Sequence, residues 1–142
     1  MKFTRKAIAH WRGPGRGGQG TITTESTVLD KTKYSYKTRF ESGKGTNPEE
    51  LIAAAHSACF TMQLSFLLEQ ANHAPNNLET EAHVTFEEGN ITLINLDVTG
   101  EVEGIDDDEF RKIAEKAKNV CPVSKVLNTS IKLNASLKEL NY

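Results

Sequence analysis

The sequence predicts an α+β fold with antiparallel sheets packed around central helices. Segments rich in β-branched and aromatic residues come first, two helical patterns follow with a pair of long strand patterns between them, and a last alternating stretch closes the chain. Because the strands are expected in hairpins, a doubly wound parallel sheet does not fit. With 142 residues, 37% of them hydrophobic, we expect a single domain over residues 1–142.

The first strands are expected at residues 2–11, 21–29 and 34–40, and together they would form an N-terminal meander. The glycine-rich segment 13–20 matches the dinucleotide-binding pattern G-x-G-x-x-G. Pro14 lies inside that pattern and no helical pattern follows it. We therefore interpret the segment as a hairpin loop rather than a nucleotide site.

The first long helix has a well-marked start in the sequence. Asn47 can cap free backbone N–H groups, and Pro48 is favoured at the first helical position. Glu49 and Glu50 match the positive end of the helix dipole, and Glu50 is placed for a capping box. The pattern continues to about Gln70 with many small residues, which predicts a central, buried helix.

The second half of the chain predicts a strand hairpin, an amphipathic helix that begins with acidic residues, a short helix opened by Pro122, and a last strand. In the short helix, Val123, Val126 and Leu127 are expected to face inward. The expected elements cover residues 78–87, 90–103, 106–120, 122–127 and 129–137.

Composition argues against nucleic acid and membranes as partners. The net charge is −2 with a pI near 6.1, and Lys and Arg are scattered among acids, so we expect no basic patch. No stretch has the form of a signal peptide, and no apolar run is expected to approach a membrane span. We therefore expect a cytoplasmic protein, in a reducing compartment where cysteine pairs are more often catalytic or sensing than structural.

The chain has two cysteines, one within a helical pattern and one at a helix boundary. Cys59 lies in an Ala-rich run, and Cys121 stands directly before Pro122, where a helical pattern stops. A buried thiol and a second thiol at a helix boundary suit a two-cysteine redox enzyme. The alternative is that both pack as small hydrophobic residues, as free cysteines commonly do, and the two cysteines alone leave both interpretations open.

A catalytic Cys59 would need a neighbouring cation. An ordinary thiol pKa of roughly 8.5 leaves only a few per cent thiolate at neutral pH. The helix dipole does not help, because the helix start lies about 15 Å away. Arg39 is the candidate, since it is expected to end a strand just before the turn at residues 43–45. A solvated arginine at a strand end is the alternative.

Glu49 is the expected partner of Arg39, through a bidentate ion pair. On the helix, Glu49 lies about 80° around the axis from Cys59, whereas Glu50 falls on the opposite face. About 15 Å of helical rise separates Glu49 from Cys59, so Glu49 would act on the Cys59 of a second subunit, which predicts a dimer. Ordinary helix-start charges remain the alternative for both glutamates.

Six segments spread over the chain carry a family resemblance. They are residues 9–11, 20–26, 38–41, 45–52, 54–60 and 117–127. With their Asn-Pro-Glu, Ala-Cys-Phe and Cys-Pro-Val-Ser signals, these segments resemble the OsmC family, the osmotically inducible bacterial proteins. That family is related to the organic hydroperoxide resistance proteins, Ohr, and the motifs here match the OsmC branch more closely.

The resemblance implies an OsmC-like, intertwined homodimer that acts as a peroxidase, with active sites at the subunit interface. Cys59 would attack the peroxide and become a sulfenic acid, and Cys121 would resolve it as an intramolecular disulfide. Arg39 would hold the thiolate and polarise the peroxide, and Glu49 would position Arg39. The role would be the reduction of organic hydroperoxides to alcohols during oxidative and osmotic stress.

The resemblance further implies no bound cofactor and no metal. The reductant would be an external dithiol, such as the lipoyl groups of a protein partner. Phe40, Phe60 and Val123 are the candidates to line an apolar pocket that buries the alkyl chain of the substrate.

Three other classes of function remain as alternatives. A metal site could use His56 with Cys59, one helical turn apart, plus Cys121 and a further histidine. A non-catalytic stress protein or small-ligand-binding protein could share the fold. A nucleophilic hydrolase is the weakest alternative, because the sequence has no Gly-x-Ser-x-Gly elbow.

Overall fold

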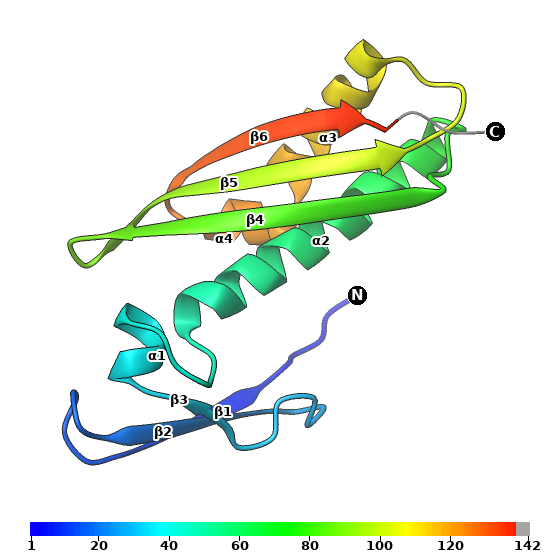
Figure 1. The fold of residues 1–142 in the computed structure, drawn as a ribbon. Helices are drawn as coiled ribbons and strands as arrows, with labels where there is room; N and C mark the ends of the chain where they lie inside the picture. The colour runs from blue at the N-terminus through cyan, green and yellow to red at the C-terminus, as the bar shows by residue number, and fades with distance from the viewer. Residues whose placement is uncertain (139–142) are drawn as a thin grey trace. The chain divides into compact units, whose positions relative to one another are not determined.

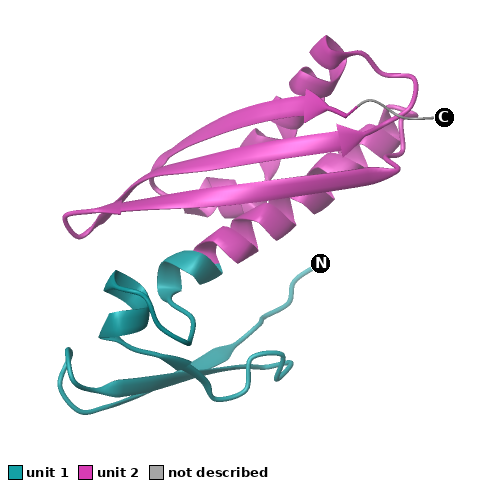
Figure 2. Cartoon of the chain, in the orientation of Figure 1, with its two compact units in different colours: residues 1–51 teal, residues 52–142 magenta. Residues whose placement is uncertain are grey.

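The chain divides into two compact units, Met1–Leu51 and Ile52–Tyr142 (Figure 2). The structure, a computed structural model, describes residues 1–138. Strands and helices follow one another in the order β1-β2-β3-α1-α2-β4-β5-α3-α4-β6 (Figure 1). This arrangement confirms the predicted α+β class.

The first unit contains a three-stranded antiparallel sheet in the order β1-β2-β3, as the predicted meander requires. The strands are β1 (Ala7–Arg12), β2 (Gln19–Thr24) and β3 (Thr32–Tyr34). Gly20 pairs with both Trp11 and Tyr34, whose ring centroids lie 5.4 Å apart. A Cβ at Gly20 would come within 2.6 Å of the Trp11 ring and would also overlap the Tyr34 ring, so the aromatic pair requires glycine.

The predicted strand at residues 34–40 is wrong beyond Tyr34. Residues Tyr36–Phe40 form a short helix, α1. Ser35 caps it, because the Thr38 amide donates to Ser35 Oγ at 3.2 Å and the Ser35 amide donates to Thr38 Oγ1 at 2.8 Å. This capping box provides local partners for the backbone, and it outweighs the strand preference of the aromatic and β-branched residues.

Helix α2 (Pro48–Gln70) begins where the sequence predicts. The Glu50 amide donates to Asn47 Oδ1 at 2.7 Å, which confirms Asn47 as the cap. The expected capping box is wrong, because the Glu50 carboxylate instead accepts a 2.8 Å hydrogen bond from the Thr46 hydroxyl.

Helix α2 buries one stripe of side chains rather than its whole circumference. The stripe consists of His56, Phe60, Leu64 and Leu68. Met62 and Phe66, on other faces, remain 63% and 54% exposed. By length and composition alone α2 could cross a membrane, which corrects the expectation that no apolar run approaches that length. Core helices meet the same criteria, and the four-residue spacing of the stripe is that of a helix packed on one side.

The second unit contains the sheet β4-β5-β6, formed by β4 (Asn77–Glu87), β5 (Asn90–Glu101) and β6 (Ser130–Leu137). Strands β4 and β5 form the predicted antiparallel hairpin. Strand β6 runs parallel to β5, so the expectation of wholly antiparallel sheets is wrong at this edge. The reason is the connection, since two helices carry the chain back along the sheet before β6 begins.

Those two helices are α3 (Asp107–Val120) and α4 (Pro122–Val126). Asp106 caps α3 by accepting from the Glu109 amide at 2.8 Å. Helices α2 and α3 lie on the same side of the sheet (Figure 1). Alternate residues of β5, namely Ile94, Leu96 and Val98, are buried in the core. Val126 is 75% exposed, so its expected inward position is wrong. The fully buried apolar side chains are Phe60, Leu64, Leu68, Ile94, Leu96, Phe110, Ala114, Ala117 and Cys121.

Candidate active site

The two cysteines lie side by side in the core of the second unit. Cys59 comes from the middle of α2, and Cys121 stands between α3 and α4. Their Sγ atoms are 3.1 Å apart and both thiols are free. Cys121 is fully buried, whereas Cys59 is half-buried. The fold therefore brings together two thiols that are 62 positions apart in the sequence.

The place of Cys121 follows from the residue after it. A residue before proline is disfavoured in the helical conformation, and Cys121 accordingly has φ −59° and ψ 122°. Its amide still donates to the Ala117 carbonyl at 2.9 Å, and its carbonyl accepts from the Lys125 amide at 3.1 Å. Cys121 thus ends one helix and begins the next, and its thiol lies at a rigid corner that faces α2.

The surroundings of Cys59 within the second unit disfavour its thiolate. Burial raises the pKa of the Cys59 thiol, and the neighbouring thiol of Cys121 raises it further. A backbone hydrogen bond from Val123 acts in the opposite direction but does not outweigh burial. A nucleophilic Cys59 therefore needs a cation from beyond these neighbours.

A buried polar contact beside the thiols escaped the sequence reasoning. His56 Nε2 and Ser124 Oγ are 2.7 Å apart, and His56 is fully buried. Burial lowers the pKa of His56 below its ordinary value of 6.5 and so favours the neutral ring. His56 precedes Cys59 by three residues, and Ser124 follows Cys121 by three. This matched spacing was a sequence signal that His56 and Ser124 lie close together if Cys59 and Cys121 are in contact.

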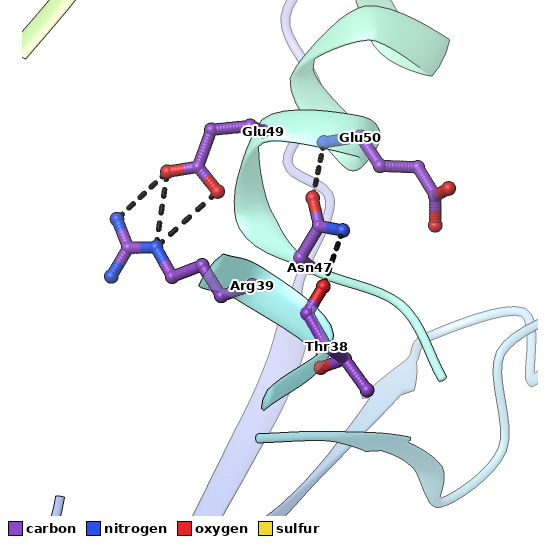
Figure 3. Close-up of polar contacts among 5 residues, drawn as sticks. All are labelled: Thr38, Arg39, Asn47, Glu49 and Glu50. Carbon is purple, nitrogen blue, oxygen red and sulfur yellow. Dashed lines mark hydrogen bonds and ion pairs between the residues drawn. The ribbon is translucent and has the colours of Figure 1, made fainter. Parts of the chain in front are cut away.

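Arg39 and Glu49 form an ion pair in the first unit (Figure 3). Arg39 Nη2 and Nε donate to Glu49 Oε1 at 2.8 and 3.1 Å, and Nε also lies 3.3 Å from Oε2. The Glu49 side chain is 14% exposed and that of Arg39 is 39% exposed. Arg39 belongs to α1 rather than to the strand end that the sequence predicts. Two donors on one carboxylate fix the plane of the guanidinium, which a single contact cannot do.

The cap of α2 also positions this ion pair. Asn47 Nδ2 donates to the Thr38 carbonyl at 3.0 Å while its Oδ1 accepts from the Glu50 amide (Figure 3). One side chain therefore joins α1 to the first turn of α2. Because Arg39 directly follows Thr38 and Glu49 directly precedes Glu50, the two hydrogen bonds of Asn47 hold Arg39 and Glu49 within reach of each other.

The four residues predicted to be catalytic thus form two pairs. Arg39 and Glu49 belong to Met1–Leu51, and Cys59 and Cys121 belong to Ile52–Tyr142. Their catalytic roles stay predictions.

The three residues expected to line a substrate pocket have different surroundings. Phe60 is fully buried in the core, so the expectation that it lines an apolar pocket around Cys59 is wrong. Phe40 is 46% exposed, and Val123 is half-buried beside Cys59.

Residues 1–138 contain no cluster of side chains that would support the alternative of a metal site. No group of three or more His, Cys, Asp and Glu side chains is placed there to hold an ion. His56 contacts Ser124, the His73 ring lies near the Glu109 carboxylate, and the His83 ring lies near the carboxylates of Glu81 and Asp97.

Comparison with known proteins places the chain in a family. The family model described as OsmC-like protein matches residues 41–136. The chain is 46% identical to Peroxiredoxin OsmC of Escherichia coli K12, over 97% of this chain and 99% of that protein. The crystal structure of the organic hydroperoxide resistance protein OhrB of Bacillus subtilis matches with a TM-score of 0.71 and 28% identity, over 96% and 98% of the two chains. An OsmC-like protein from Mycoplasma pneumoniae shares the fold with a TM-score of 0.77 at 13% identity, over 98% and 100% of the chains. This protein belongs to the OsmC family.

Proposed function

We propose that this protein is a thiol peroxidase that reduces organic hydroperoxides to alcohols by a two-cysteine mechanism, in defence against oxidative and osmotic stress. The observation that carries the proposal is the 3.1 Å contact between two free thiols, one half-buried and one fully buried. The names of the relatives, a peroxiredoxin and an organic hydroperoxide resistance protein, support this class of reaction.

In the first step, the Cys59 thiolate attacks one peroxide oxygen and the O–O bond breaks. The alkoxide leaves and takes a proton, which gives the alcohol, and Cys59 becomes a sulfenic acid. In the second step, Cys121 attacks the Cys59 sulfur. The new S–S bond displaces hydroxide, which takes a proton to become water. Because the two sulfurs are already in contact, this step needs little movement of the core.

Arg39 is proposed to supply the charge that Cys59 lacks. The neighbours of Cys59 in the second unit raise its pKa, so an additional cation must favour the thiolate. The guanidinium of Arg39 is oriented by the carboxylate of Glu49. An arginine fixed in this way would also stabilise the negative charge that develops on the leaving oxygen.

We propose that the working unit is a homodimer in which the Arg39–Glu49 pair of one subunit serves Cys59 of the other. Helical rise alone separates Glu49 from Cys59 by about 15 Å along α2, which is too far for one small substrate. Met62 and Phe66 of α2 are 63% and 54% exposed, and a second subunit would cover such apolar side chains.

A subunit-mixing experiment tests the dimer. Cys59→Ser and Glu49→Gln chains are each expected to be inactive alone. When they are unfolded together and refolded as an equal mixture, half of the dimers are mixed, and each mixed dimer has one complete site. Activity should then return to about a quarter of the wild-type level. No recovery, with mixed dimers verified by a tag on one chain, would place the whole site within a single subunit.

The reductant is proposed to be an external dithiol, such as a protein-bound lipoyl group. Regeneration of the two thiols takes two electrons and two protons, which a dithiol delivers as it closes to a disulfide. The proposal includes no bound cofactor and no metal, and it places the reaction in the cytoplasm, where such dithiols stay reduced.

The first test measures the mass and the free-thiol count of the reduced protein after one equivalent of tert-butyl hydroperoxide. Wild type should lose both thiols and about two mass units. The Cys121→Ser variant should stop at a sulfenic acid that dimedone traps. Cys59→Ser is the matched control, because it keeps one thiol and should not react. Survival of both thiols in the wild type would reject the catalytic proposal.

A second test isolates the role of Arg39. Arg39→Gln should raise the pKa of Cys59, measured by thiolate absorbance near 240 nm, and should slow the reaction with tert-butyl hydroperoxide by about a hundredfold. Arg111→Gln is the control, since Arg111 is also paired with a carboxylate, that of Asp108. An unchanged Cys59 pKa in Arg39→Gln would assign the activation to another group.

A further inference from the structure

The first unit contains a cavity that the peroxidase chemistry does not use. Its volume is about 520 Å³, which lies within the range of small-molecule sites. Its lining comes from β1, β2, β3, α1 and the loops around them, all within Met1–Leu51. Its lining includes the buried Gly18 and Gly20 and the half-buried Tyr34. The cavity is therefore complete within one unit.

Five cationic side chains line this cavity. They are Arg12, Arg16, Lys33, Lys37 and Lys44. No acidic side chain is among the lining residues that the structure describes. None of the five forms an ion pair with an acidic residue in the described part of the chain, although four other cations do, namely Arg39, Arg111, Lys118 and Lys138. Within residues 1–138, no acidic side chain is ion-paired with the cations of the cavity.

The sheet register explains how some of these charges gather. His10 pairs with Thr21, and Thr21 pairs with Lys33, so the three lie in one row across the sheet. Arg12 is two residues beyond His10 and therefore projects from the same face. Arg16 comes from the hairpin loop, and its guanidinium lies 5.0 Å from the centre of the Tyr36 ring, a cation–π contact.

The charge of the whole chain hides this accumulation. Residues 1–51 contain ten Lys and Arg against five Asp and Glu, whereas residues 52–142 contain seven against fourteen. A net charge of −2 therefore combines a basic segment with an acidic one. The expectation that the chain has no basic patch is wrong for this cavity, because the fold brings the cations of the basic segment together.

We propose that the cavity is a binding site for a small polyanion with two or more linked phosphate groups. Five positive charges around about 520 Å³ match a ligand that concentrates several negative charges in a few ångströms. A di- or triphosphate does this, whereas an acidic peptide spreads its carboxylates along a chain. The guanidinium groups of Arg12 and Arg16 suit phosphate oxygens by their fork of donors.

This site goes beyond the peroxidase proposal and does not depend on it, because neither cysteine lines the cavity. Isothermal titration of the reduced full-length protein with sodium triphosphate should show saturable binding that weakens as salt rises from about 0.05 to 0.5 M. Orthophosphate should bind at least tenfold more weakly, since it presents fewer charges.

Two matched variants locate the binding. Arg12→Gln/Lys33→Gln removes two cavity cations and should weaken triphosphate binding at least tenfold. Lys2→Gln/Lys6→Gln removes the same charge from the same unit outside the cavity and should change the affinity less than about twofold. Circular dichroism and the fluorescence of Trp11, the single tryptophan, check that both variants fold.

Two results would overturn the proposal. One is the absence of saturable triphosphate binding at millimolar concentration and low salt. The other is equal weakening in both double variants, which would indicate diffuse attraction to the basic unit. Binding of poly-glutamate or of phosphatidylglycerol vesicles without binding of triphosphate would also overturn the proposal. It would indicate that the basic cavity binds a macromolecular partner.

Discussion

Replacing Ser124 with alanine tests how the buried histidine beside the thiols is stabilised. Ser124 Oγ lies 2.7 Å from His56 Nε2. His56 Nδ1, the other ring nitrogen, has no partner among the described residues. The substitution would leave both nitrogens of a fully buried ring without a partner. A buried polar group left unsatisfied costs about 1–3 kcal/mol, so we expect a loss of this size in the free energy of unfolding.

Urea denaturation at a fixed protein concentration provides the assay, because the stability of an oligomer depends on concentration. With a slope of about 2 kcal/mol/M, the midpoint should fall by about 0.5–1.5 M with the slope unchanged. The reduced protein is used throughout, so that disulfide formation does not contribute to the change.

A double-mutant cycle separates this contact from a general effect of the substitution. In a His56→Phe background no ring nitrogen remains, and the half-buried hydroxyl of Ser124 can bond to water. Ser124→Ala should then cost less than about 0.5 kcal/mol. Equal costs in the two backgrounds, or a cost near zero in the wild type, would refute the claim that the His56–Ser124 contact stabilises the core.

Three further outcomes are expected. Burial lowers the pKa of His56 below 6.5, so as pH falls the unfolded chain binds a proton at His56 before the folded chain does. The free energy of unfolding should therefore fall as pH drops below about 6.5 and level off below the folded-state pKa. Urea titrations across pH would measure this, and in His56→Phe this pH dependence should be absent. Gly20→Ala should unfold the first unit more readily, seen in Trp11 fluorescence, because its Cβ would overlap the Trp11 ring; Gly15→Ala, with nothing within 4 Å, should leave that transition in place. Asn47→Ala should cost about 0.5–2 kcal/mol by removing the cap of α2, measured by thermal unfolding; a melting temperature equal to that of the wild type would deny the capping role.

Several elements follow from local sequence chemistry alone. The start of α2 is encoded by an asparagine cap followed by proline, and the end of α3 is encoded by the proline that follows Cys121. The long β4–β5 hairpin follows from two alternating runs around a tight turn at Gly89, whose φ is +83°. Caps, prolines and turns act over a few residues, so they can be identified without knowledge of the fold.

Local patterns failed where two of them competed or where the partner was distant. Residues 36–40 have strand-like composition, but the Ser35–Thr38 capping box makes them a helix. The alternation of β6 predicts a strand without indicating its direction, which the α3–α4 connection made parallel. The small residues predicted a central, buried α2, and the structure buries this helix along one stripe of side chains.

The sequence by itself determined the family, the order of most elements and the four residues proposed to act on peroxide. Motifs and caps depend on neighbouring residues, so they can be identified before the tertiary structure is known. Tertiary structure alone decided that two thiols 62 positions apart would lie 3.1 Å from each other and that His56 would meet Ser124. It also decided that five cationic side chains would line one cavity in a chain of net charge −2. These features depend on which distant segments pack together, and that choice is made by burial of the shared core rather than by the preferences of neighbouring residues.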